Sequence, residues 1–147
     1  MDTAATPTPA RLRALPSWLI NQAAIAANRR TDRALADTGS RRYDFAMLAA
    51  LDEVGPSSQA DLGRCTGIDR SDVVAAINAM VDRGFVDRSP DPADGRRNVV
   101  TLTPAGSEHL KRVSGLLADA QSELLHALSA DESKTLVELL RRVVDSR

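Results

Sequence analysis

The stretch that decides the fold is residues 83–106, RGFVDRSPDPADGRRNVVTLTPAG. Two segments within it, residues 85–89 and 98–102, have the composition expected of β-strands. Between these segments lies a run of prolines, aspartates and a glycine, which are residues that favour turns. The sequence therefore predicts a β-hairpin whose tip contains Asp94, Gly95, Arg96 and Arg97.

The chain on the N-terminal side of the hairpin has a helical hydrophobic period. This period predicts four helices, Pro16 to about Ala36, Arg42 to Val54, Gln59 to Cys65, and Asp69 to Arg83. In the fourth helix, Asp69 is the expected N-cap and Asp72 occupies the N3 position of a capping-box variant. The expected apolar face of this helix comprises Val73, Val74, Ile77, Met80 and Val81.

Two further helices are predicted after the hairpin. Thr103 is the expected cap and Pro104 the first residue of a long helix. The apolar side of this helix is expected to comprise Leu110, Val113, Leu117, Leu124 and Leu128. Residues 129–132 form a capping box that begins the last helix. The apolar stripe of the last helix comprises Leu136, Leu139, Leu140, Val143 and Val144.

This order of elements defines the predicted fold class. A short helix, a glycine-containing turn, a second helix and a β-hairpin form a winged helix-turn-helix, so the protein is expected to be mainly α with a small β-hairpin wing. We predict a flexible arm at residues 1–11, a winged helix-turn-helix DNA-binding domain at residues 41–103, and a helical dimerisation region formed by residues 12–40 and 104–147. The terminal helices carry more apolar surface than one subunit can bury, which predicts a homodimer.

The composition restricts the classes of protein that the chain can belong to. Of its 147 residues, 43% are hydrophobic and 3% aromatic, which favours a folded helical chain over disorder or a β-sandwich. The net charge of -1 means that nucleic-acid binding would need locally placed cations. The N-terminus lacks the layout of a signal peptide, no apolar run could cross a membrane, and a single cysteine fits a reducing compartment. We expect a soluble cytoplasmic protein with no membrane partner.

Residues 94–106 resemble the wing signature of the MarR family (multiple antibiotic resistance regulators). The signature is an Asp, one residue, an Arg, five residues and Leu-Thr, and here it runs from Asp94 to Thr103. Residues 83–88 and Asp91-Pro92 also fit the family pattern, and the element order matches from about Leu15 to Val144. The resemblance implies a dimeric transcriptional regulator, most often a repressor, that binds double-stranded DNA at a palindromic operator and responds to a small aromatic or phenolic molecule.

Candidate DNA-binding residues lie on the hairpin and on the two helices before it. The resemblance implies that Arg96 enters the DNA groove, next to Arg97, while Asp94 holds the arginine or the hairpin in shape through a charge-assisted pair, with Arg88 as a candidate partner. The fourth predicted helix, Asp69 to Arg83, is the expected recognition helix, which reads the DNA bases. Its solvent side is expected to present Arg70, Ser71, Asp72, Ala75, Ala76 and Asn78. Candidate phosphate anchors at the start of the third helix are Ser57, Ser58 and Gln59.

The recognition helix departs from the family pattern. Similar proteins usually carry Thr or Ser and an Arg where this chain has Asp72, Val74 and Ala75. Asp72 could accept a hydrogen bond from a cytosine amine or serve only as a helix cap. We therefore expect wing, phosphate and DNA-shape contacts to supply an unusually large share of binding.

The resemblance also implies an effector pocket between the dimerisation helices and the winged lobe. Its expected wall comprises Trp18, Asn21, Gln22, Tyr43, Asp44 and Met47. The alternative is that the aromatic pair, Trp18 and Tyr43, belongs to the core of the dimer. Cys65 is the only thiol, and we expect it to be buried and inert, packed against the recognition helix.

Other classes of function are weaker alternatives. An interaction module without DNA binding would use the small residues Ala75, Ala76 and Ala79, and a redox-responsive regulator would use Cys65. We expect that the protein is not an enzyme and that it has no cofactor and no metal site. His109 and His126 are too far apart on the predicted fifth helix to share a metal, and no phosphate-binding glycine loop or nucleophile motif is present in the sequence.

Overall fold

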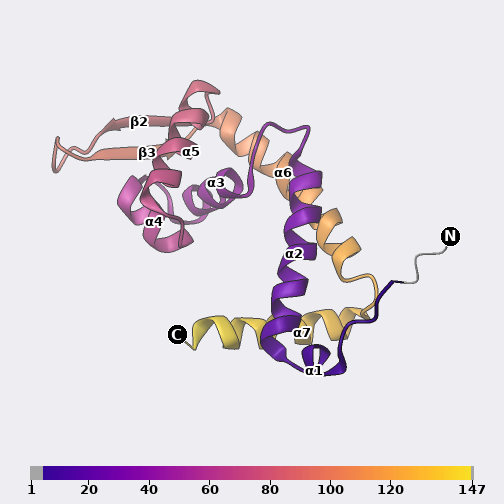
Figure 1. Ribbon diagram of the computed structural model, residues 1–147. Helices are drawn as coiled ribbons and strands as arrows, with labels where there is room; N and C mark the ends of the chain where they lie inside the picture. The colour runs from indigo at the N-terminus through magenta and orange to yellow at the C-terminus, as the bar shows by residue number, and fades with distance from the viewer. Residues whose placement is uncertain (1–4, 147) are drawn as a thin grey trace. The chain divides into compact units, whose positions relative to one another are not determined.

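The computed structural model describes residues 5–146, and most of these residues lie in helices (Figure 1). The elements in chain order are α1 (Ala10–Arg13), α2 (Pro16–Leu35), α3 (Arg42–Val54), β1 (Ser57–Ser58), α4 (Gln59–Thr66), α5 (Arg70–Asp82), β2 (Val86–Pro90), β3 (Asn98–Leu102), α6 (Pro104–Leu124) and α7 (Ala130–Asp145). They form two compact units. One comprises residues 31–119, and the other comprises the residues up to 30 together with those from 120 onward.

All the predicted helices and both strands of the hairpin are present, with differences at the N-terminal arm and at the C-terminal end of α6. The one-turn helix α1 begins at Ala10, within the chain predicted as a flexible arm, and ends at Arg13, beyond it. Residues 1–4 of that arm lie outside the described residues. Helix α6 ends at Leu124, so Leu128 and His126, which were expected on it, lie in the turn that follows. In that turn Leu128 N donates to Leu125 O at 2.9 Å, and the capping box of the next helix begins immediately afterwards.

The sheet has a third strand that the sequence analysis missed. Strand β1 pairs antiparallel with β3, with Ser57 opposite Val100 and Ser58 opposite Val99, and the strand order is β1-β3-β2. A strand of two serines has no alternating pattern to reveal it, because its existence depends on pairing with residues about forty positions later in the chain. The consequence is that the two residues just before α4 are paired with the middle of strand β3.

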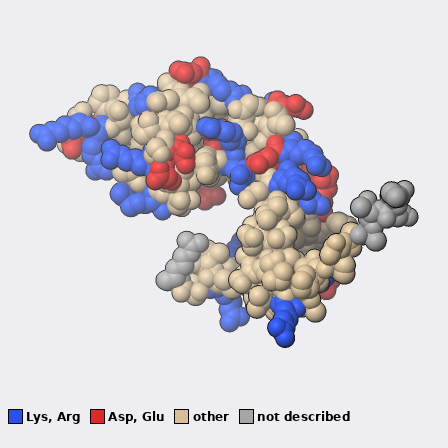
Figure 2. All heavy atoms as spheres, viewed as in Figure 1, with Lys and Arg blue, Asp and Glu red and all other residues tan. Residues whose placement is uncertain are grey.

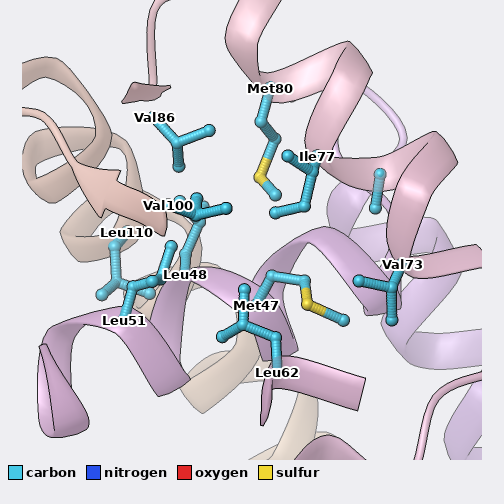
Figure 3. Close-up of a cluster of buried hydrophobic side chains, with 11 residues drawn as sticks. Met47, Leu48, Leu51, Leu62, Val73, Ile77, Met80, Val86, Val100 and Leu110 are labelled. Carbon is cyan, nitrogen blue, oxygen red and sulfur yellow. The ribbon is translucent and has the colours of Figure 1, made fainter. Parts of the chain in front are cut away.

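The hydrophobic core of residues 31–119 joins α3, α4, α5 and the sheet. Figure 3 shows Ile77 and Met80 from α5 beside Val86 and Val100 from the strands, with side chains of α3 below them. The buried members are Met47, Leu48, Leu51, Leu62, Val73, Ala76, Ile77, Met80, Val86, Val100 and Leu110. Burial of this set fixes the angle at which α5 meets the hairpin.

The apolar face predicted for α5 was wrong at two residues. Val74, expected to be buried, is 36% exposed, whereas Ala76, expected on the solvent side, is 0% exposed. The buried positions Val73, Ala76, Ile77 and Met80 follow the spacing i, i+3, i+4 and i+7 of one helical stripe, and Val74 lies outside that stripe. Position on the helix therefore overrides the hydrophobicity of the side chain here.

The turn between α4 and α5 requires one glycine. Gly67 ends α4 with φ +69°, which is a left-handed conformation that L side chains rarely adopt, and its N–H donates to Gly63 O at 2.9 Å. This tight ending sets the start of α5 three residues later.

The helices beyond residue 119 carry an apolar stripe that is open in the single chain. The capping box of α7 is confirmed, because Ser129 Oγ accepts from Glu132 N at 3.1 Å and Glu132 Oε1 accepts from Ser129 N at 2.9 Å. The exposed large apolar residues of α7 are Val137, Leu139, Leu140, Val143 and Val144. Within residues 5–146, no helix combines the length and the apolar character that crossing a membrane requires.

Candidate nucleic-acid interface

The tip of the β2–β3 hairpin is held by hydrogen bonds from two aspartates. Asp94 Oδ1 accepts from Arg96 N at 3.1 Å, and Asp94 O accepts from Arg97 N at 3.0 Å. Asp91 Oδ1 accepts from Ala93 N at 2.8 Å, and Arg97 O accepts from Asp91 N at 2.7 Å. These bonds fix the backbone of the tip while Arg96 and Arg97 remain exposed.

The pairing suggested for Asp94 was wrong in its partner. Asp94 shapes the hairpin through the backbone N–H of Arg96 and makes no ion pair with Arg88. Arg88 Nη1 instead lies 3.4 Å from Gln59 Oε1, the acceptor that β1 brings next to the sheet. Within residues 5–146 the guanidinium of Arg96 has no hydrogen-bond or ion-pair partner, so it is free to bind an external acceptor.

A polar network joins the tip of the hairpin to the start of α4. Arg97 Nη2 lies 3.4 Å from Ser58 Oγ, and Ser58 Oγ donates to Asp61 Oδ2 at 2.8 Å and accepts from Asp61 N at 3.1 Å. Asp61 also forms an ion pair with Arg64 one turn later. The hydrogen bonds from Ser58 and Arg64, helped by the charges of Arg64 and Arg97, lower the pKa of Asp61 below its usual value.

Asp61 and Arg64 were not identified from the sequence. Both lie on α4, where charged residues at i and i+3 are usually only a solvated pair. Their relation to Arg97 comes from the unpredicted strand β1, so no local signal could have revealed it. The network leaves the carboxylate of Asp61 near two arginines, Arg64 and Arg97, on the surface formed by the hairpin and α4.

The exposed stripe of α5 comprises Ser71, Val74, Ala75 and Asn78, with Arg70 at the first helical position. Asp69 caps the helix as predicted, but its Oδ2 accepts from Ser71 N at 3.2 Å and from Ser71 Oγ at 2.6 Å. The reciprocal bond expected from Asp72 is therefore not formed, because the cap is directed at the second helical residue and not the third. These bonds to Ser71 lower the pKa of Asp69.

The three candidate phosphate anchors lie together around β1. Ser57 and Ser58 form this strand and Gln59 begins α4, so the expectation that all three start the helix was wrong for the two serines. Ser57 Oγ donates to Gly55 O at 2.8 Å, and all three side chains are half-buried. Their hydroxyl and amide groups are therefore partly engaged within the protein.

The cations on this unit are local, as binding to DNA by an acidic chain requires. Figure 2 shows Lys and Arg spheres at the outer end of the hairpin and over the helices beside it, with acidic side chains interspersed. The exposed arginines of the hairpin and of α4–α5 are Arg64, Arg70, Arg88, Arg96 and Arg97.

The effector residues expected from the sequence do not form one wall within residues 31–119. Met47 is 0% exposed in the hydrophobic core, and Asp44 is buried with Oδ2 accepting from Arg41 N at 2.8 Å, so neither presents a free face. Tyr43, which is 43% exposed, does line a hollow. Trp18, Asn21 and Gln22 lie on the part of α2 that belongs to the other unit.

The hollow lies at the junction of α2 and α3 and has a volume of about 520 Å³. It is lined by Asp32, Leu35, Ala36, Gly39, Ser40, Arg41, Arg42 and Tyr43. Arg42 Nε forms an ion pair with Asp32 Oδ1 at 2.9 Å across this hollow. Sequence reasoning missed most of these residues because the loop between the helices carries no motif.

The expectation that Cys65 is buried was wrong. The cysteine is exposed, and its Sγ lies 3.5 Å from Leu62 O. The fully buried residue of α4 is Leu62, and Cys65, one turn later near the end of the helix, is exposed although it lies close to the same face.

A three-stranded sheet with a basic hairpin beside a helix-turn-helix defines a winged helix-turn-helix protein. Residues 39–97 match the model of the MarR family. Together with the relatives described next, this match shows that the chain belongs to the MarR family.

The relatives are transcriptional regulators, not enzymes. The chain is 33% identical over 102 residues to the HTH-type transcriptional repressor NicR of Pseudomonas putida, a match that covers 69% of this chain and 65% of NicR. It thus spans slightly less than two thirds of that relative.

Solved structures match over a larger share of the chain. A probable transcriptional regulator from Pseudomonas aeruginosa is 32% identical, with a TM-score of 0.82 over 90% of this chain and 99% of that one. BpsR of Bordetella bronchiseptica, whose DNA binding is regulated by 6-hydroxynicotinic acid, is 25% identical, with a TM-score of 0.84 over 97% and 100%.

Proposed function

We propose that this protein is a sequence-specific transcriptional repressor that binds duplex DNA. The observation that carries the proposal is the hairpin tip, where two aspartates fix the backbone and leave the guanidinium of Arg96 unpaired. A rigid tip with a free guanidinium suits insertion into a narrow groove, where the negative potential of DNA is concentrated. The exposed stripe from Ser71 to Asn78 would lie in the adjacent major groove, with Val74 able to contact a thymine methyl group.

Selection of bound fragments from the organism's own genome tests this proposal. We expect one set of related sequences, retained in a mobility-shift assay, with an affinity that falls steeply as salt increases. Retention that is absent, or insensitive to salt, would contradict DNA binding and favour an interaction module. Ala76 is buried, which leaves that module only Ala75 and Ala79 of its three proposed contact residues.

We further propose that the repressor is a homodimer that binds a palindromic operator. Support comes from α7, where five large apolar side chains are at least 39% exposed in the single chain. Apolar surface of this extent is usually covered in the functional assembly. Light scattering should give twice the chain mass, and the recovered DNA should contain two half-sites about one helical turn apart. A monomer in solution, or recovered sites without symmetry, would contradict this part of the proposal.

We also propose that a small aromatic acid releases the repressor from DNA. The hollow between α2 and α3 offers the Tyr43 ring and two arginines, Arg41 and Arg42, the second of which would exchange its pair with Asp32 for a flat anionic molecule. The likeness to BpsR suggests 6-hydroxynicotinic acid as a first probe. We expect this probe to reduce DNA retention, and to do so less in a Tyr43→Ala variant. Binding of the probe with unchanged retention would contradict release.

A further inference from the structure

His109 lies where three parts of the unit meet. It is on α6, is 8% exposed, and its Nε2 lies 2.7 Å from Oγ of Ser40, in the loop before α3. Its ring stacks on Phe85 with a centroid separation of 4.2 Å and an interplanar angle of 13°. One side chain therefore contacts both the α2–α3 loop and the residue that connects α5 with β2.

Phe85 is fixed at this connection from both sides. Its N–H donates to Met80 O of α5 at 3.0 Å, and its carbonyl accepts from Thr103 N, before α6, at 3.1 Å. A displacement of the Phe85 ring would therefore be transmitted to the end of the recognition helix and to the first strand of the hairpin.

Arg83 completes the arrangement from the end of α5. Its Cζ lies 4.5 Å from the centroid of the Phe85 ring, and its Nη2 donates to Thr38 O at 2.8 Å. The guanidinium lies against Gly39, where a Cβ atom would come within 2.9 Å of Nη1. Arg83 and His109 thus both contact Phe85, and both are hydrogen-bonded to the loop of residues 38–40.

The charges around His109 favour its neutral form. Burial lowers the pKa of His109, and the positive charges of Arg83 and Arg112 lower it further, whereas Asp44 on α3 acts in the opposite direction. Protonation would place a second cation beside Arg83 on the same aromatic ring. The contacts that fix Phe85 would then be weakened by repulsion and by the cost of a buried charge.

We propose that neutral His109 is a positioning residue for DNA recognition, which holds the junction of α5 and β2 so that its protonation weakens DNA binding. This inference rests on the proposed function. The expected change in DNA affinity has a distinctive sign, because an added positive charge by itself would strengthen binding to DNA. Loss of affinity on acidification therefore separates a positional effect from simple electrostatic attraction.

The chain contains two histidines, so a test with matched variants is possible. The affinity for a genome-selected duplex would be measured at about pH 7.5 and at a pH below the midpoint of the His109 ring titration, which we expect below the ordinary histidine range because the pKa of His109 is lowered. We expect the wild type and a His126→Gln variant to lose about fivefold or more in affinity, the lower end of typical coupling between sites. A His109→Gln variant should bind equally at both pH values. A flat profile, or tighter binding at low pH, in His126→Gln would overturn the proposal whether or not the His109 variant folds.

Backbone amide shifts provide a second readout that does not require DNA. In the His126→Gln variant, the amides of Gly84, Phe85 and Thr103 should titrate with the midpoint of the His109 ring. Amides that do not follow that midpoint would overturn the positional role. If no duplex is retained at any pH, the proposed function fails, and the amide titration still decides whether His109 sets the junction.

Discussion

Arg97 Nη2 lies 3.4 Å from Ser58 Oγ, and this contact connects the tip of the hairpin to the N-cap of α4. The two residues are 39 positions apart in the chain, and strand β1 brings them together. Arg97 is thus partly engaged, whereas the guanidinium of Arg96 has no partner among residues 5–146. The two neighbouring arginines therefore have different roles at the surface, which separate variants can distinguish.

Arg96→Ala should reduce the slope of log affinity against log salt by about one, because one protein cation fewer neutralises the DNA and about one counterion fewer is released. Arg97→Ala should have a smaller effect, since its guanidinium is shared with Ser58, and the double variant should abolish retention. A salt titration of DNA affinity measures these effects. Arg141→Ala on α7 carries the same change of charge and should leave the slope unchanged. Equal slopes for all variants would reject the wing as the contact.

Asp61→Asn should strengthen DNA binding. The substitution removes a negative charge and releases Arg64 and Arg97 from it, so both guanidinium groups become available to phosphate. The affinity should rise by a few-fold, most clearly at low salt. Glu108→Gln is the matched control, because Glu108 forms an i,i+3 ion pair with Lys111 on α6. If Asp61→Asn weakened binding, the carboxylate would be needed to position the arginines.

The stability of the fold should fall as the pH drops below about 6.5, the ordinary pKa of histidine. The pKa of His109 is lowered in the folded state, so over this range the unfolded chain binds the proton more strongly than the folded chain. The stability that neutral His109 contributes is fully present above pH 6.5 and is lost as the pH falls through that value toward the folded-state pKa. Thermal unfolding of the wild type and of His109→Gln measures it. His126→Gln should keep the dependence, and its disappearance there would assign the effect to the wrong histidine.

Gly106→Ala should destabilise the protein by about 1–3 kcal/mol, the usual cost of overpacking. A Cβ atom at Gly106 would collide with Phe85 O and come within 2.8 Å of Leu102 Cδ1. Gly115→Ala on the same helix meets nothing within 4 Å and should stabilise α6 by about 0.5–1 kcal/mol. Denaturant unfolding of both variants checks the contrast. Equal effects would mean that the α6–Phe85 contact is not tight in solution.

Cys65→Ser should leave the DNA affinity and its response to peroxide unchanged. The thiol is exposed, but its only hydrogen bond in the described chain is to Leu62 O of its own helix. Oxidation therefore disturbs no contact with α5 or the hairpin. Mobility-shift assays before and after peroxide treatment test this. A wild-type response that the serine variant lacks would instead support the redox-responsive alternative.

The elements of the fold were largely predictable, because local signals specify them. Strand β3 and helix α3 begin and end where the sequence predicts, since turn formers and glycines bound both segments. The face of α5 was less predictable. Val74 is more hydrophobic than Ala76, yet Ala76 is buried, since burial follows the position on the helix.

The candidate site likewise has one part that the sequence predicts and another that only the tertiary structure reveals. Asp94, Arg96 and Arg97 belong to one contiguous motif, so the sequence alone determined a basic hairpin tip and the family of the chain. Only the tertiary structure decided which acceptor Arg88 meets, which arginine is free, and that His109 stacks on Phe85. These relationships join residues that are far apart in the chain. Short-range preferences set each element, whereas the contacts between elements depend on how the whole core packs.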